Sequence, residues 1–422
     1  MNIKTVPLAP RSRKSAGALL ISASLALGAC SSSDDDAPRN VPGDPFANAS
    51  DASAVAFVSG ATSGFDAGQI ERLVIGQDIV STGVTPATES DIRVATDGED
   101  VYEIGRFQLD TLTRFDIADL SDPVYQYSLN GSESVSNPYA VVFLNDDKAY
   151  VTRRGSALLW IIDPSAATEA NFLLGTIDLS AYDSDAQPEM TDALLVDDRL
   201  FVLMERLDEN SAPVQNGYVA VIDTATDTEV DTGEGQDGLN GIALQTSNPT
   251  GLQYLPESDE IYVVGRGNIF ENDAVQEDFY NGGIETIDPD TYRNDLLLDD
   301  GTAQDNDDYF TDALIVSPTK GYVLTYAAFR QTTLRTFNPM MGVMDDAPVA
   351  GLSDQDISVL ALGPEGRVWV GINGDEGSGF RVLDTADDSV LVERVPTEFN
   401  PNGIVFIERP AQTDPGIGFA TR

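Results

Sequence analysis

Short apolar segments separated by polar and glycine-containing turns recur through residues 54–409 with a period of about 50 residues. Each period predicts four short strands, because no 3.6-residue periodicity is sustained and turn residues punctuate the pattern. The second strand carries an aromatic residue, and successive aromatics lie 48, 51, 61, 60 and 47 residues apart. These residues are Tyr102, Tyr150, Phe201, Tyr262, Tyr322 and Trp369.

Four short strands per period are typical of a β-propeller blade. Six complete blades fit between Glu89 and Val395, and the remaining segments complement one another. Residues 402–407 have the pattern of a first strand, and residues 54–58, 71–75 and 78–81 have those of a second, third and fourth strand. We therefore predict an all-β, seven-bladed β-propeller whose ring is closed by the N-terminal strands plus the C-terminal strand, which removes exposed strand edges.

Two segments carry a resemblance to a known family. Residues 149–152 read Ala-Tyr-Val-Thr and are followed by a strand at 158–163, and residues 217–224 read Gly-Tyr-Val-Ala-Val-Ile-Asp-Thr. With the Asn-Pro turns at Asn137, Asn248 and Asn400, they resemble the YVTN-repeat β-propellers. That family includes binding proteins, periplasmic proteins without known activity and lactonase-like enzymes, so the resemblance implies a fold and no single function.

The first 29 residues predict a cleavable signal peptide. A basic stretch without acidic residues contains Lys4, Arg11, Arg13 and Lys14, and an apolar stretch of 12 residues covers 16–27. Such a stretch is too short to span a bilayer as a helix. Residues 27–30, Leu-Gly-Ala-Cys, resemble the lipobox of bacterial lipoproteins, which implies that Cys30 accepts a lipid.

The expected organisation follows from these boundaries. Residues 1–29 are the signal peptide, 30–53 a flexible acidic tether, 54–409 the propeller and 410–422 a flexible tail. By resemblance to the sorting rule of Gram-negative lipoproteins, Ser31 after the cysteine implies anchoring in the outer membrane. The alternative is the inner membrane, on its periplasmic side.

Composition removes several classes of function. The formal net charge is -46, and loss of four cations with the signal peptide brings it near -50. This charge opposes nucleic-acid binding and electrostatic docking on anionic lipid, and it fits adaptation to salt. The chain has no histidine, which excludes Ser-His-Asp triads and imidazole-bound metals, and its one cysteine excludes an internal disulfide framework.

Arginines recur in the loop that follows the second strand, three of them four residues after the aromatic, one five residues after it and one further along the loop. They are Arg106, Arg154, Arg206, Arg266 and Arg330. In a propeller this loop meets the start of the first strands around one mouth of the channel. The first strands bring to the same end Asp91, Asp192, Asp312 and Asp356, with Tyr139, Thr250 and Asn402 at the matching positions.

Two interpretations of this arginine ring stay open. The arginines can form forked salt bridges to carboxylates of neighbouring blades and fix blade against blade. Alternatively, some guanidinium groups remain unpaired and make the mouth receptive to a carboxylate, a phosphate or an acidic partner loop.

Evidence for a metal or cofactor is weaker. Asp305, Asp307 and Asp308 offer oxygen ligands suited to calcium, but their spacing does not match an EF-hand loop, and an acidic surface loop is the simpler interpretation. We expect no cofactor.

The function expected from the sequence is that of a non-enzymatic envelope lipoprotein. Its propeller face would bind a protein partner or a small anionic or amphipathic ligand, as an accessory to an outer-membrane transporter or assembly system. One alternative is a calcium-dependent, lactonase-like hydrolase that uses Asp192, Asp312, Asp356 and Asn402. The other is a purely structural envelope protein.

Overall fold

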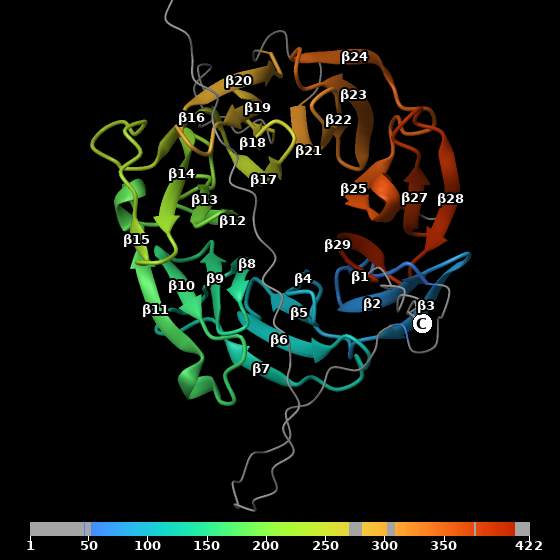
Figure 1. The fold of residues 1–422 in the computed structure, drawn as a ribbon, viewed down its shortest axis with the longest axis horizontal. Helices are drawn as coiled ribbons and strands as arrows, with labels where there is room; N and C mark the ends of the chain where they lie inside the picture. The colour runs from blue at the N-terminus through green and yellow to red at the C-terminus, as the bar shows by residue number, and fades with distance from the viewer. Residues whose placement is uncertain (1–45, 47–51, 270–280, 302–308, 375–376, 410–422) are drawn as a thin grey trace, which may run out of the picture. The chain divides into compact units, whose positions relative to one another are not determined.

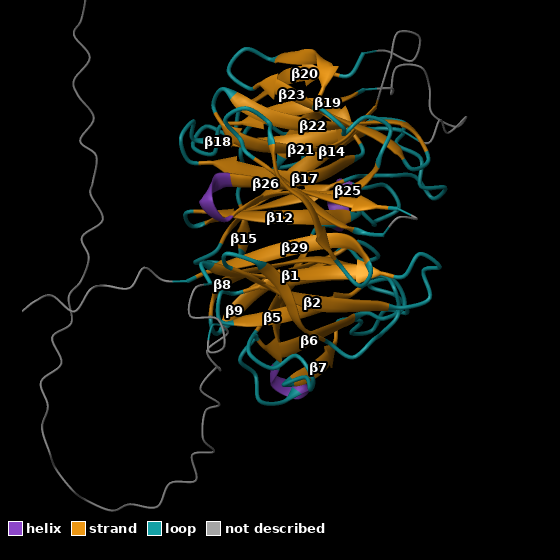
Figure 2. Ribbon diagram, turned by 90° about the vertical axis from the view of Figure 1, so that its right-hand side faces the viewer, coloured by secondary structure: helices purple, strands orange, loops and turns teal. Residues whose placement is uncertain are grey.

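Seven antiparallel sheets stand around a central channel in the computed structural model, which describes residues 46, 52–269, 281–301, 309–374 and 377–409 (Figure 1). The prediction of an all-β, seven-bladed propeller is confirmed. Seen edge-on, the strands cross the ring and the loops gather at its two ends (Figure 2). Blades 1–6 are numbered in chain order from residue 92, and blade 7 combines the two ends of the folded part.

Each blade contributes one strand to the channel wall and three strands outside it. The innermost strands of blades 1–7 are β4 (Ile92–Thr96), β8 (Pro138–Asn145), β12 (Met190–Val196), β17 (Pro249–Leu255), β21 (Tyr309–Ser317), β25 (Asp356–Gly363) and β29 (Asn400–Glu408). The second strands are β5 (Asp100–Gly105), β9 (Lys148–Arg153), β13 (Arg199–Met204), β18 (Glu260–Arg266), β22 (Lys320–Ala328), β26 (Arg367–Asn373) and β1 (Ala54–Ala61).

The outer half of each blade follows the same order. The third strands are β6 (Thr111–Asp116), β10 (Leu158–Ile162), β14 (Asn216–Asp223), β19 (Gly282–Ile287), β23 (Gln331–Asn338), β27 (Gly379–Leu383) and β2 (Gly68–Ile75). The fourth strands are β7 (Tyr125–Ser128), β11 (Leu173–Asp178), β15 (Thr228–Glu229), β20 (Asn294–Asp299), β24 (Val343–Pro348), β28 (Val390–Pro396) and β3 (Ile79–Val84). The described residues contain short 3-10 turns at Glu169–Asn171, Ser180–Tyr182 and Pro364–Gly366, and no helix among them is long and apolar enough to cross a membrane.

Blade 3 differs from the predicted four-strand pattern. Its fourth strand, β15, has only two residues, and an additional strand, β16 (Ile242–Ser247), pairs with β14 beyond it. The sequence did not predict β16. The physical reason is that the long connection after β15 returns to the free edge of β14 and satisfies its backbone groups there.

The ring closes through pairing between residues that are far apart in the chain. Strand β29 runs antiparallel to β1, with Ala54 opposite Glu408 and Val58 opposite Ile404. Strands β2 and β3 complete the sheet. The predicted seventh blade is therefore confirmed. Its innermost strand, β29, contacts β25 of blade 6 and β4 of blade 1.

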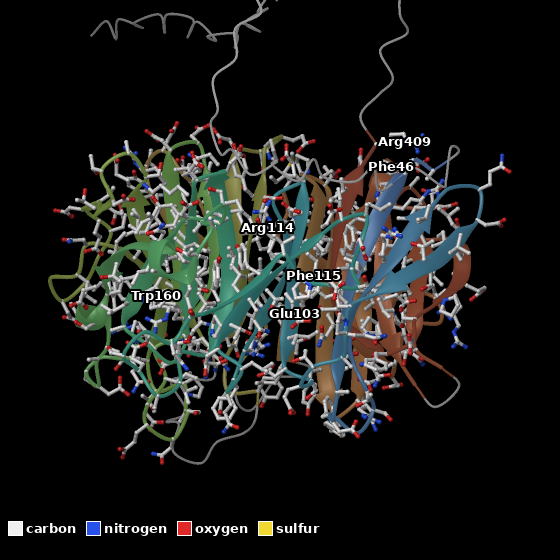
Figure 3. All side chains as sticks on the ribbon, turned by 90° about the horizontal axis from the view of Figure 1, so that it is seen from below. Phe46, Glu103, Arg114, Phe115, Trp160 and Arg409 are labelled. Carbon is white, nitrogen blue, oxygen red and sulfur yellow. The ribbon has the colours of Figure 1, made fainter. Side chains whose placement is uncertain are left out.

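The hydrophobic core lies between neighbouring blades. All six aromatics of the second strands are buried, with exposed fractions of at most 3%, in agreement with the repeat pattern. Side chains alternate between the two faces of a strand, so Tyr102 packs with Trp160 of blade 2 while Val101 packs with Phe57 of blade 7. Phe46, which lies within the expected tether, is also buried, and the Arg409 guanidinium carbon lies 4.5 Å from its ring centre (Figure 3).

One polar contact between blades is built in the same way twice. The Lys148 amine donates to both oxygens of Asp227 at 2.7 and 2.8 Å, and the Tyr150 hydroxyl donates to the same carboxylate at 2.6 Å. This contact joins blade 2 to blade 3. Lys320 and Tyr322 of blade 5 make the same pair of bonds to Asp388 of blade 6. We call each of these a clasp.

We expect Asp227→Ala to lower the free energy of unfolding by about 1–2 kcal/mol, because it leaves the Tyr150 hydroxyl without an acceptor and removes the ion pair of Lys148. Asp388→Ala removes the equivalent clasp and should have a similar effect. The control is Asp295→Ala, since Asp295 pairs with the exposed Arg293 and its loss should change stability by less than about 0.5 kcal/mol. Urea unfolding midpoints measure all three, and equal effects of Asp227→Ala and Asp295→Ala would contradict the role of the clasp.

A buried carboxyl without a partner lies on β5. Glu103 is 3% exposed, and its Oε2 atom has no hydrogen-bond partner among the described residues (Figure 3). Burial raises the pKa of Glu103 to about 7. The unfolded chain ionises near pH 4.5, so between pH 4.5 and 7 the folded state holds the extra proton and stability falls as pH rises.

Glu103→Gln should therefore stabilise the protein at pH 8 by up to about 3 kcal/mol and have little effect at pH 4.5. Unfolding free energies of both proteins at several pH values measure this. A difference that does not depend on pH would show that Glu103 remains ionised in the folded state.

Candidate functional site

The predicted arginines lie at one end of the ring, where the loops after the second strands meet the connections that lead to the first strands. We call this end the mouth. Each arginine lies at or after the end of a second strand. Arg106 and Arg154 directly follow β5 and β9, and Arg206 is the second residue after β13. Arg266 is the last residue of β18, and Arg330 lies between β22 and β23. What their guanidinium groups contact decides between the two interpretations of the arginine ring.

Arg154 and Arg266 fix neighbouring blades to one another. Arg154 donates from Nε and Nη2 to Oε2 of Glu205 at 2.9 and 2.7 Å, and Arg266 donates from Nη2 to Oε1 of the same residue at 3.4 Å. The Glu205 side chain is 4% exposed and follows β13 of blade 3, so one buried carboxylate joins blades 2, 3 and 4. For these two arginines the structural interpretation holds, and a forked pair of this kind orients both partners.

Tyr139, at the start of β8, is surrounded by cations. The guanidinium carbons of Arg106, Arg93 and Arg154 lie 3.8, 4.8 and 5.8 Å from its ring centre, within the range of cation–π attraction. Arg106 also approaches Asp91, with 3.4 Å between Nε and Oδ1. Burial and the neighbouring charge of Arg93 lower the pKa of Arg106.

Arg206 does not face the channel. Its Nε and Nη1 atoms donate to the carbonyl oxygens of Tyr182 and Asn216 at 2.6 and 3.1 Å, and its guanidinium carbon lies 4.6 Å from the ring centre of Tyr218. These contacts stabilise blade 3 and its connections. The position of Arg206 one residue later in its repeat than Arg106 or Arg154 explains the difference, because an extra residue in a loop redirects the side chain.

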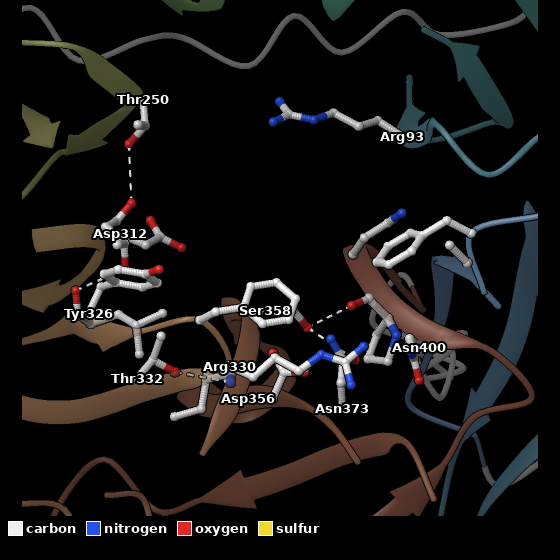
Figure 4. Close-up of a pocket in the computed structure, with 18 of the residues that line it drawn as sticks. Arg93, Thr250, Asp312, Tyr326, Arg330, Thr332, Asp356, Ser358, Asn373 and Asn400 are labelled. Atoms are coloured by element: carbon white, nitrogen blue, oxygen red, sulfur yellow. Dashed lines mark hydrogen bonds and ion pairs between the residues drawn. The ribbon is translucent and has the colours of Figure 1, made fainter. Parts of the chain in front are cut away.

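A cavity of about 680 Å³ opens at the mouth (Figure 4). It is lined by seven of the twelve residues that the sequence placed at this end, namely Asp91, Thr250, Arg266, Asp312, Arg330, Asp356 and Asn402. The other five, which are Arg106, Arg154, Arg206, Tyr139 and Asp192, do not line it. The volume lies within the range of pockets that hold small ligands.

Three of the lining groups contact other side chains of the protein. Arg330 pairs with Asp356, with 3.3 Å between Nε and Oδ2. Asn402 accepts a hydrogen bond from the Ser59 hydroxyl at 2.6 Å. Burial raises the pKa of Asp356, and the charge of Arg330 opposes this shift.

Two aspartates near the channel differ in their contacts. Asp192 accepts hydrogen bonds from the backbone N–H groups of Leu252 and Ala193, both at 2.9 Å, and so links β12 to β17. Asp312 accepts one, from Ala313 at 2.8 Å, and its Oδ2 atom has no donor among the described residues. Burial raises the pKa of Asp312 to about 6, although the charges of Arg93 and Arg266 oppose the shift.

Arg93, the second residue of β4, was not predicted from the sequence as a residue of the mouth. It lines the cavity, and no described residue forms an ion pair or a hydrogen bond with its guanidinium group. In Figure 4 its side chain extends into the open space of the mouth, opposite the side from which Asp312 comes. The available signal was a charged residue between the apolar Ile92 and Val94 on a channel-lining strand.

Two exposed aromatic residues stand at the edge of the cavity. Phe65, between β1 and β2, is 64% exposed, and Phe329, between β22 and β23, is 76% exposed. Large exposed apolar side chains beside a polar cavity are typical of binding surfaces. The sequence pattern did not single out either residue, because both lie in loops.

The carboxylates of the calcium alternative do not form a metal-binding group in the described part of the chain. No group of three His, Cys, Asp or Glu residues that could hold a metal ion is found in the described part of the chain, which includes Asp192, Asp312 and Asp356. Asp305, Asp307 and Asp308 lie outside the described residues, as does Cys30.

Comparisons with known proteins agree with the fold. No family model matches the chain, and no curated protein matches its sequence significantly. Among solved structures, a candidate 6-phosphogluconolactonase of Bacteroides fragilis is similar with a TM-score of 0.59 at 13% identity, over 86% of this chain and 99% of the other. A protein from Lactobacillus plantarum has a TM-score of 0.58 at 14% identity, over 84% and 99% of the two chains.

The apocarotenoid oxygenase of Synechocystis has a TM-score of 0.52 at 10% identity, over 85% of this chain and 93% of the other. At such identities the likeness concerns the backbone alone, since one fold supports many functions. What the chain shares with these proteins is the β-propeller fold.

Proposed function

We propose that this protein is a lipid-anchored envelope lipoprotein that binds through the mouth of its propeller and catalyses no reaction. The observation that supports this most directly is the cavity of about 680 Å³, where Arg93 has no ion-pair partner among the described residues and Phe65 and Phe329 are exposed at the edge. A guanidinium group and exposed aromatics together suit recognition of a polar group carried by a partly apolar ligand or partner loop.

The alternatives are less well supported. The calcium-dependent hydrolase needs carboxylates grouped around the metal, and no such group is found among the described residues of the mouth. A purely structural role would predict that all charges of the cavity are paired internally. Arg93 and Asp312 do not meet that condition among the described residues.

The anchor and the location are part of the proposal. Cys30 would carry the lipid, and Ser31 directs the protein to the outer membrane, where the mouth could serve an uptake or assembly system. Attachment by a lipid through a tether of the predicted kind would leave the propeller free to turn its mouth toward a partner.

Cys30→Ser should abolish incorporation of radiolabelled palmitate and move the protein from the membrane fraction to the soluble or unprocessed pool, because the thiol is the only acceptor in the chain. Metabolic labelling followed by fractionation measures both effects. Undiminished labelling of Cys30→Ser would rule out the lipid anchor.

Partner binding at the mouth can be tested by photo-crosslinking in cells. A photoreactive phenylalanine analogue at position 329 should give adducts with an envelope protein, because Phe329 stands at the edge of the cavity. The matched control is the same analogue at position 341. Met341 is 69% exposed and Phe329 76%, but they lie beyond opposite ends of β23.

Adducts at 329 and none at 341 support a partner at the mouth. Equal adducts at both positions, or adducts at 341 alone, would contradict it.

A further inference from the structure

Six charged residues line the mouth cavity, and four of them are paired. They are Asp91, Arg93, Arg266, Asp312, Arg330 and Asp356. Asp91 pairs with Arg106, Arg266 with Glu205, and Arg330 with Asp356. Among the described residues, Arg93 and Asp312 are left without an ion-pair partner.

These two charges have opposite signs and come from distant blades. Arg93 lies on β4 of blade 1, and Asp312 on β21 of blade 5. Their side chains enter the mouth from different sides and do not form an ion pair (Figure 4). Neither charge is therefore neutralised by the other at contact distance.

Both side chains are positioned by contacts with the protein, and these contacts leave hydrogen-bonding atoms of each group open. The Arg93 guanidinium carbon lies 4.8 Å from the ring centre of Tyr139, and the Asp312 carboxylate is held at Oδ1 by the backbone N–H of Ala313. The N–H groups of Arg93 and the Oδ2 atom of Asp312 remain available to a ligand. Positioning of this kind reduces the entropy lost on binding.

The charge pattern discriminates between classes of ligand. A purely anionic ligand gains Arg93 but is repelled by the Asp312 carboxylate, and a purely cationic ligand meets the reverse situation. A molecule with one charge of each sign gains both contacts. The repulsion of anions by Asp312 and of cations by Arg93 disfavours ligands that carry a single charge.

We propose that the mouth cavity binds a small zwitterion, with its carboxylate on Arg93 and its ammonium group on Asp312. This inference rests on the proposed function of the mouth and names the ligand class. The neutral polar groups of Thr250 and Tyr326 line the same space and can accept or donate hydrogen bonds to the rest of the ligand.

The proposal has a pH signature. Asp312 is faced by Arg93 from β4, Arg266 from β18 and Asp192 from β12, and its pKa is raised to about 6. The ammonium group requires the ionised carboxylate, so affinity should fall about tenfold between pH 7.5 and pH 5.

Calorimetry on the purified full-length protein in detergent tests the ligand class. The probes are ω-amino acids of increasing length, namely glycine, 4-aminobutyrate, 6-aminohexanoate and 8-aminooctanoate. Each is compared with the alkanoate and the alkylamine of the same chain length. At least one ω-amino acid should bind ten times more tightly than both of its single-charge analogues, and the best length reports the separation of the two charges.

Variants assign the two contacts. Arg93→Gln should remove the advantage of that amino acid over the amine, and Asp312→Asn should remove its advantage over the alkanoate and the loss of affinity at pH 5. Arg293→Gln, an exposed arginine outside the cavity, should change nothing. Thermal unfolding of each variant checks that it is folded, and either cavity variant alone suffices for the test.

The outcomes separate this inference from the proposed function. If no ω-amino acid exceeds both of its analogues, or if both cavity variants leave binding unchanged, the zwitterion proposal is overturned. If the zwitterion proposal is overturned but crosslinks form at position 329, the mouth is still a partner site and only the proposed ligand class is rejected. Zwitterion binding without such crosslinks supports the ligand and removes the protein partner.

Discussion

The antiparallel pairing of β29 with β1 is the constraint on which the rest of the molecule depends. It joins residues more than 340 positions apart, such as Ala54 and Glu408, into one sheet. A propeller left open at this point would expose strand edges and the apolar faces of blades 6 and 7, where Trp369 packs against Phe380 and Phe406. Closure also sets the distances across the channel, so the separation of Arg93 and Asp312 is a consequence of it.

Contacts between blades resist the opening of the ring at other seams. The residues expected to remain after signal cleavage include only two lysines, Lys148 and Lys320, and each is used in a clasp between neighbouring blades. Glu205 at the mouth also joins neighbouring blades, because it pairs with both Arg154 and Arg266. In a chain with a net charge of -46, these two lysines and two arginines are found where a carboxylate must be neutralised at a seam.

The fold could be predicted because its signal is repeated. One buried aromatic per second strand recurs at spacings of 47 to 61 residues, and the incomplete pattern at each end completes the other. Strand β16 gave no such signal, since it exists only because β15 is short and leaves an edge of β14 free. Repetition predicts what the blades share, and it does not predict how one blade departs from the others.

The site was less predictable for a related reason. Sequence register placed Arg154 and Arg266 at the mouth correctly, but register carries no information on the carboxylate that holds them, because Glu205 belongs to another blade. Arg93 lies on a channel-lining strand outside the repeated arginine position, so the same register could not include it. Whether a charge at the mouth is free depends on contacts across blades, which only the closed ring determines.

The overall charge gives a physical reason why a zwitterion suits this protein better than an anion. A net charge of -46 repels anions at distances up to the Debye length, which is about 10 Å at 0.1 M salt and 30 Å at 0.01 M. A zwitterion has no net charge and approaches without that barrier, and it meets Arg93 and Asp312 only inside the cavity. Long-range repulsion and the short-range pattern of the mouth therefore select for the same class of ligand.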